Sequence, residues 1–123
     1  MTAAKGTGAA TTYRVATVPG DGIGPEVIAA GRRALEAVGR VFGFGFEWTE
    51  IIAGGHGIDT HGVAIRPEDV EVARAADAIY LGAVGGPRWD NPNAPVRPEQ
   101  ALFALRGGLD LFANLRQIGR AHV

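Results

Sequence analysis

The sequence predicts an α/β fold in which helices flank a largely parallel sheet. Short apolar segments rich in β-branched residues alternate with longer segments whose apolar residues recur at helical spacing, and glycine- and proline-rich turns separate them. Two strand–loop–helix passages lead into a further apolar strand, an order typical of parallel sheets. The 123 residues suit one small domain, and 46% hydrophobic residues is ordinary for a globular core.

The first strand–loop–helix passage covers residues 13–42. "YRVATV" predicts a strand, "PGDGIG" a turn, and "PEVIAAGRRALEAVGRVF" a helix. Pro25 is tolerated at the first helical position because an N–H there has no partner within the helix. We expect this helix to cover the sheet with one apolar stripe, which consists of Val27, Gly31, Ala34, Leu35, Val38 and Val41.

The second passage covers residues 46–84. "FEWTEII" alternates as a strand does, residues 53–67 read as a long glycine-rich connection, and "PEDVEVARAAD" predicts a shorter helix. "AIYLGAV" predicts a buried strand, and a further helix is expected to start at Pro98 and Glu99. Residues 1–12 are interpreted as a flexible tail that precedes the domain.

Composition excludes several function classes. The 12 basic and 13 acidic residues leave a formal charge of −1 without a block of like charge, so neither nucleic acid nor a membrane is an expected partner. No apolar run is long enough to span a bilayer. The chain has no cysteine, which fits a cytoplasmic location, and no serine, which excludes a Ser-His-Asp mechanism.

Three polar residues of the glycine-rich loops receive structural interpretations. His56 and His61 bracket Asp59, but histidines five apart in a flexible loop lack the rigid face that a metal site needs. We therefore predict no metal site among these residues. Asp21, in the "GDG" turn, is explained by the preference of aspartate for turns.

Two glycine-rich segments are candidates for cofactor contact. "GDGIGPE" follows a strand and opens a helix, but it departs from the dinucleotide fingerprint because Pro25 takes the place of the third glycine. It is either a tight connection or a helix N-terminus that faces a cofactor. "GAVGGPRWDNPNAPVRPE" ends a strand with glycines, where ligands of α/β sheets collect. The alternative is a surface crossover in which Trp89 acts as a hydrophobic plug.

The expected helix after Pro98 carries a mixed stripe. Glu99, Leu102, Phe103 and Arg106 stand at i, i+3, i+4 and i+7, and therefore on one face. If the stripe faces a cleft, Arg106 can bind a carboxylate and the apolar pair can receive an alkyl group. The other reading is a solvated face, with Glu99 near the positive end of the helix dipole. Arg116, ten residues further on, is either a second carboxylate ligand or a surface residue.

Four ordered motifs in residues 13–116 resemble the amino-terminal third of the β-decarboxylating dehydrogenases, and most closely the isopropylmalate branch. They are "VPGDGIGPEV", "AIYLGAVGGPRWD", "VRPEQALFALR" and "LDLFANLR". The resemblance implies NAD-dependent oxidative decarboxylation of 3-isopropylmalate to 2-oxoisocaproate in leucine biosynthesis. It also implies a cytoplasmic homodimer that uses Mg²⁺ or Mn²⁺. The resemblance makes residues 13–116 a truncated, partial α/β dehydrogenase domain.

The resemblance assigns residue roles as well. Arg106 and Arg116 match arginines that bind the malate carboxylates, Leu102 matches the contact to the isopropyl group, and Glu99 matches a glutamate near the nicotinamide ribose. Phe103 stands where many relatives carry leucine. The segment expected to lie along NAD consists of Gly86, Pro87, Arg88, Trp89, Asp90, Asn91, Pro92, Asn93, Ala94, Pro95, Val96, Arg97, Pro98 and Glu99.

Two other functions remain open at this stage. One is a tartrate- or D-malate-type dehydrogenase of the same family, and the other is a non-catalytic nucleotide-binding module. The resemblance places the catalytic and metal-binding residues of the family after the last residue of this chain, so none of them is expected here. Residues 117–123 do not resemble the family continuation, and residues 118–123 can be encoded by ATC GGA AGA GCA CAC GTC, the start of a common sequencing adapter. We expect this tail to be non-native.

Overall fold

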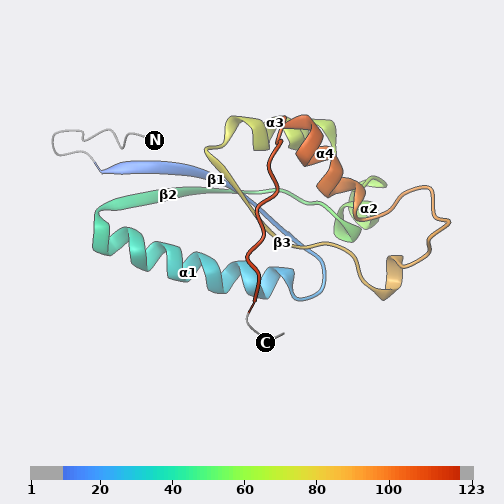
Figure 1. Cartoon of the computed structure of the whole chain (residues 1–123), viewed down its shortest axis with the longest axis horizontal. Helices are drawn as coiled ribbons and strands as arrows, with labels where there is room; N and C mark the ends of the chain where they lie inside the picture. Colours follow the sequence, from blue (N-terminus) through green and yellow to red (C-terminus); the bar gives the residue numbers. More distant parts are fainter. Residues whose placement is uncertain (1–9, 120–123) are drawn as a thin grey trace.

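A computed structural model describes residues 10–119 and has a three-stranded parallel sheet at its centre (Figure 1). The strands are β1 (Thr11–Gly20), β2 (Phe44–Glu50) and β3 (Ala78–Ala83). β1 is the central strand and pairs in parallel with both neighbours, so the order across the sheet is β2-β1-β3. The predicted α/β class with a parallel sheet is confirmed.

The first strand and helix are longer than expected. β1 begins at Thr11, inside the predicted flexible tail, and residues 1–9 of that tail lie outside the described residues. β1 ends at Gly20, whose φ of +73° and close approach to the Ala83 carbonyl require glycine. The helix α1 (Gly24–Phe42) then runs to Gly43, a left-handed C-cap whose N–H donates to the Gly39 carbonyl at 2.8 Å.

The apolar stripe predicted for α1 is correct for Gly31 and Leu35 and wrong for its other members. Val27, Val38 and Val41 are 46%, 42% and 77% exposed, and Ala34 is exposed as well. The helix turns a different face to the sheet than expected because glycines on that face allow its backbone to approach the strands. A side chain at Gly31, for example, would overlap the Tyr80 hydroxyl. The face that packs on the sheet consists of Gly24, Ile28 and Gly39, which are buried, and Gly31 and Leu35, which are half-buried.

The opposite face of the sheet is covered by α3 (Pro67–Ala75) and α4 (Gln100–Gly108), as Figure 1 shows. The main hydrophobic cluster lies between these helices and the strands, and five of its eight members are alanine. Small side chains allow a close approach between the layers, so the larger members carry much of the buried apolar area. The cluster consists of Ala16, Val18, Ile51, Ala53, Ala64, Ala73, Ala101 and Leu105.

Residues 53–67 were predicted to be a glycine-rich loop, but they contain a helix, α2 (Gly55–His61). The prediction of an irregular connection is therefore wrong for these seven residues. Its sequence, "GHGIDTH", has low helix propensity. Glycines in positive-φ conformations stand immediately before and after it, Gly54 and Gly62, each with φ of +77°. A seven-residue helix of this composition needs tertiary contacts to form, and these contacts are part of the site described below.

The segment after α4 has no regular secondary structure. In Figure 1 it leaves the layer of α3 and α4 and runs toward the side of the view that holds α1. Phe112 and Leu115 are 100% and 94% exposed. The tail expected to be non-native, residues 117–123, is described only to Gly119, and residues 120–123 lie outside the described part. No helix among residues 10–119 has the length and hydropathy to cross a membrane.

Candidate functional site

The loops that follow the three parallel strands meet at the carboxylate of Asp21. Its Oδ2 accepts the N–H groups of Gly55 and Gly85, and its Oδ1 accepts that of His56, each at 2.7 Å. The residue is only 4% exposed, so these charge-assisted bonds lie away from water. Turn preference, the interpretation reached from sequence, does not describe this role. Asp21 joins the turn after β1, the start of α2 and the loop after β3.

The loop expected to face NAD, residues 86–99, is docked on α2 near its beginning. It opens with a single 3₁₀ turn, η1 (Pro87–Trp89). Arg88 forms a salt bridge of 3.1 Å with Asp59, and the indole Nε1 of Trp89 donates to the same carboxylate at 3.4 Å. Trp89 also lies against Gly55, where any side chain would overlap its ring. Trp89 is half-buried in this contact.

The end of the same loop returns to its beginning. The Glu99 carboxylate oxygen Oε1 is 3.4 Å from the position that a β-carbon on Gly85 would occupy, and Arg97 forms a salt bridge of 3.4 Å with Glu99. A cavity of about 470 Å³ lies beside these residues. It is lined by Arg97, Glu99, Gln100 and Phe103. The two ends of the loop thus lie close together at Gly85 and Glu99, and a cavity lies beside its last residues.

The mixed stripe of α4 faces away from the hydrophobic cluster of this chain. Ala101 and Leu105 are the buried residues of the helix, whereas Phe103 is 63% exposed. Leu102 and Arg106 are half-buried. The stripe does not line one cavity, because Glu99 and Phe103 line the cavity beside the loop and Arg106 lines another.

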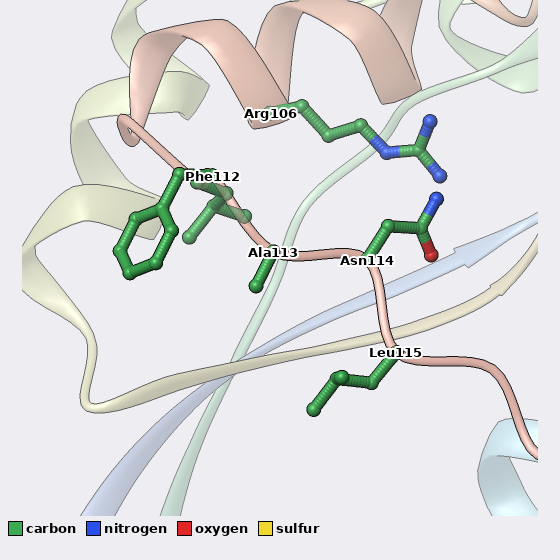
Figure 2. Close-up of a pocket in the computed structure, with 6 residues that line it drawn as sticks. Arg106, Phe112, Ala113, Asn114 and Leu115 are labelled. Carbon is green, nitrogen blue, oxygen red and sulfur yellow. The ribbon is translucent and has the colours of Figure 1, made fainter.

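The second cavity, of about 440 Å³, brings Arg106 together with the "FANLR" segment. Figure 2 shows the Asn114 amide directed toward the Arg106 guanidinium. The Oδ1 of Asn114 accepts a hydrogen bond of 3.4 Å from the Nε of Arg116. Within residues 10–119, neither arginine has a carboxylate within 4.0 Å. The cavity is lined by Arg106, Leu111, Phe112, Ala113, Asn114 and Leu115.

Each of the two arginines is suited to bind a carboxylate: Arg106 lines the cavity, and Arg116 bonds to Asn114 of its lining. Two guanidinium groups without an acidic partner in the described part of the chain can each bind an oxyanion. Asn114 is the residue that sequence reasoning missed. The one sequence signal that could have indicated Asn114 is its position within the "FANLR" motif. Residue type alone does not show that its side chain contacts an arginine.

The sequence profile of the isocitrate/isopropylmalate dehydrogenase family matches residues 14–121, which is most of the chain. The chain belongs to this family. The resemblance read from the four motifs is confirmed.

Relatives and a solved structure of the family match the same region. The chain is 55% identical over 109 residues to the 3-isopropylmalate dehydrogenase of Anaeromyxobacter dehalogenans, covering 89% of the chain and 31% of that protein. It is 52% identical to that of Hahella chejuensis, over 84% of the chain and 29% of that protein. The crystal structure of a β-decarboxylating dehydrogenase from Thermococcus kodakarensis, in its apo form, matches with a TM-score of 0.60 and 37% identity. This match covers 81% of the chain and 27% of that structure.

The chain spans about 30% of the length of these curated relatives. Among residues 10–119, no three His, Asp or Glu side chains are grouped closely enough to hold a metal ion. Asp59, which stands between His56 and His61, binds Arg88 and Trp89 of the loop. Within the described residues the candidate site therefore consists of arginines, a loop and a helix, without a cluster of three metal-ligand side chains.

Proposed function

We propose that this chain is the amino-terminal part of an NAD-dependent 3-isopropylmalate dehydrogenase that acts in leucine biosynthesis. The whole protein would convert 3-isopropylmalate to 2-oxoisocaproate by oxidative decarboxylation, as a cytoplasmic homodimer. The names of the relatives support this assignment. The observation that carries it is that Arg106 lines a cavity of about 440 Å³ with Asn114, which in turn accepts a hydrogen bond of 3.4 Å from Arg116.

The two arginines are proposed to bind the carboxylates of the malate unit. A guanidinium group presents two parallel N–H donors to a carboxylate, so each arginine fixes orientation as well as charge. Leu102 is proposed to contact the isopropyl group. It is half-buried and stands one turn before Arg106 on α4, which places alkyl and carboxylate recognition on one helix.

The residues of the loop fit a nicotinamide cofactor. Glu99 keeps 44% of its side chain exposed beside the cavity of about 470 Å³, so its carboxylate can accept a hydrogen bond from a ribose hydroxyl. When bound, NAD supplies the hydride acceptor for oxidation of the 2-hydroxy acid. Residues 86–99 are proposed to hold and orient it.

A divalent cation, Mg²⁺ or Mn²⁺, is proposed as a second cofactor of the whole protein. The described residues of this chain do not fit it, since no three carboxylate or histidine side chains converge among residues 10–119. No step of the reaction is therefore assigned to the cation here. The contribution of this chain is substrate binding through Arg106 and Arg116 and cofactor binding through the loop.

The test is a substrate comparison on the full-length protein, meaning the complete reading frame that carries these residues. We expect kcat/KM for 3-isopropylmalate to exceed that for isocitrate, tartrate and D-malate by at least about 100-fold. An apolar contact leaves the additional carboxylate of isocitrate and the additional hydroxyl of tartrate unpaired, and D-malate has no alkyl group to fill it. A higher kcat/KM for tartrate or D-malate than for 3-isopropylmalate would show that the proposed substrate is wrong and would assign that acid instead. NAD binding without turnover of any of these acids would favour a nucleotide-binding module.

A further inference from the structure

Asp59 of α2 contacts two consecutive side chains of the loop. Its Oδ2 forms the salt bridge of 3.1 Å with Nη1 of Arg88, and its Oδ1 accepts the indole N–H of Trp89 at 3.4 Å. The Arg88 guanidinium also lies over the Trp89 ring, with 5.6 Å between its carbon and the ring centroid. Both oxygens of one carboxylate are therefore engaged by η1.

The anchor does not depend on the salt bridge alone. The Arg88 side chain is 72% exposed, and an ion pair at such a position contributes little by itself. Trp89, however, packs on Gly55 at the first position of α2. The indole is thus held by its ring on one side and by its N–H on the other. Asp59 fixes which way the ring faces.

The helix that carries Asp59 is itself tied to the start of the loop. Asp21 binds the N–H groups of Gly55 and Gly85, so α2 and residue 85 share one buried carboxylate. Beyond η1, the described polar contacts of the loop are local, as in the bond of 3.0 Å from the Asn93 N–H to Asn91 Oδ1. The later part of the loop is bound to α4, where the Gln100 amide donates to the Pro95 carbonyl at 3.2 Å. Asp59 is therefore the side chain of α2 that binds the exposed start of the loop, η1, to the rest of the domain.

We propose that Asp59 is a positioning residue for the cofactor: it orders η1 and residues 86–99 before the cofactor binds. The proposal rests on the proposed function, because it takes NAD as the ligand of this loop. Ordering a loop in advance lowers the entropy lost on binding, so it raises cofactor affinity without a contact to the cofactor. Asp59 is not assigned any part in the chemical step.

Three substitutions in the full-length protein test the anchor. Asp59→Ala removes both contacts and should raise KM for NAD about tenfold, while kcat changes less than about twofold. Asp59→Asn keeps an acceptor for Trp89 and loses the charge, so its KM should rise about threefold. Asp59→Glu keeps the charge and should restore KM to within about threefold of the parent value. KM for 3-isopropylmalate should stay unchanged in all three.

The matched control is Glu71→Gln, which removes a comparable exposed salt bridge of 3.2 Å to Arg74 on α3, away from the loop. It should leave KM for NAD unchanged. A fall in kcat and thermal stability with unchanged KM for NAD in Asp59→Ala would mean that the residue is only structural, and it would overturn the proposal.

Amide hydrogen exchange separates failure of the anchor from failure of the proposed function. The N–H groups of Trp89 and Asp90 bond within η1, to the carbonyls of Gly86 and Pro87. Their exchange in the cofactor-free protein should accelerate about tenfold in Asp59→Ala and remain unchanged in Glu71→Gln. Unaltered exchange would exclude the anchor even if the enzyme uses NAD. If exchange accelerates but the protein does not bind NAD, Asp59 orders the loop as proposed, and the proposed cofactor function is wrong.

Discussion

The loop after β3 and the segment after α4 both carry proposed ligand-binding residues, but they are held in very different ways. The loop is tied to the domain through Asp21 and Asp59, and Trp89 packs on α2. The segment has exposed side chains, including Phe112 and Leu115, and its described side-chain hydrogen bond is the one between Asn114 and Arg116. The proposed cofactor side is organised by packing within this chain, whereas the proposed carboxylate-binding side has few described polar contacts.

The buried carboxylate of Asp21 is the contact on which the first region depends most. Asp21→Asn should lower the free energy of unfolding of the full-length protein by about 4 kcal/mol, because three N–H groups lose a charged acceptor and the amide NH₂ would face some of them. Urea denaturation measures the change. Asp110→Asn, at an exposed residue with φ of +54° that asparagine tolerates, is the control and should be neutral. Equal stability of the two variants would contradict the role given to Asp21.

Helix α4 lies between the two regions in the chain and contributes residues to the cavity beside each of them, and its two faces can be tested separately. Leu105→Ala should cost about 3 kcal/mol of stability because Leu105 is 4% exposed in the alanine-rich cluster. Phe103→Ala, on the exposed face, should cost less than about 0.5 kcal/mol and still lower kcat/KM. Thermal unfolding and steady-state kinetics on both variants make the comparison. Large destabilisation by Phe103→Ala would mean that this face packs elsewhere in the full-length protein.

The second region should be more sensitive in function than in stability. Arg106→Lys should lower kcat/KM for 3-isopropylmalate by about 100-fold, because a lysine cannot present two parallel donors to a carboxylate. The melting temperature should not change. Arg33→Lys, at an exposed position of α1, is the matched control for loss of a guanidinium and should have normal kinetics. A normal kcat/KM in Arg106→Lys would remove this residue from the substrate site.

Asn114 offers the smallest and most specific test. Its side chain lies toward Arg106 in the cavity and accepts a hydrogen bond from Arg116, so Asn114→Ala should leave Arg116 less well oriented and remove a polar group beside Arg106 (Figure 2). KM for 3-isopropylmalate should rise about tenfold with unchanged KM for NAD. The opposite split, a changed KM for NAD alone, would assign Asn114 to the other region.

The sequence predicted most of the secondary structure because its strands and longer helices have strong periodicity. The helices α1, α3 and α4 and all three strands were expected close to their observed positions. The buried face of α1 was predicted only in part, because glycines that permit close packing carry no hydrophobic signal. The helix α2 was missed for a related reason: its seven residues form a helix through bonds to Asp21, which stands 34 residues before Gly55.

The site was predictable where spacing or a family motif singles out residues. Helical spacing singled out Arg106, the position after a strand singled out the loop, and the family motifs gave roles to both and to Arg116; these roles stay predictions. Asp21, Asp59 and Asn114 act by joining segments that are distant in the chain or by lying between two side chains, as in the contacts of Asp59 with Arg88 and Trp89. Residue type alone indicates a turn or a loop at these positions. Three-dimensional contacts were needed to give them a role.

A crystal structure of the full-length protein with bound 3-isopropylmalate tests the central assignment most directly. We expect guanidinium nitrogens of Arg106 and Arg116 to lie at hydrogen-bond distance, about 2.7–3.2 Å, from the substrate carboxylates, with Leu102 against the isopropyl group. Carboxylates bound by other residues, with Arg106 extended into solvent, would contradict it.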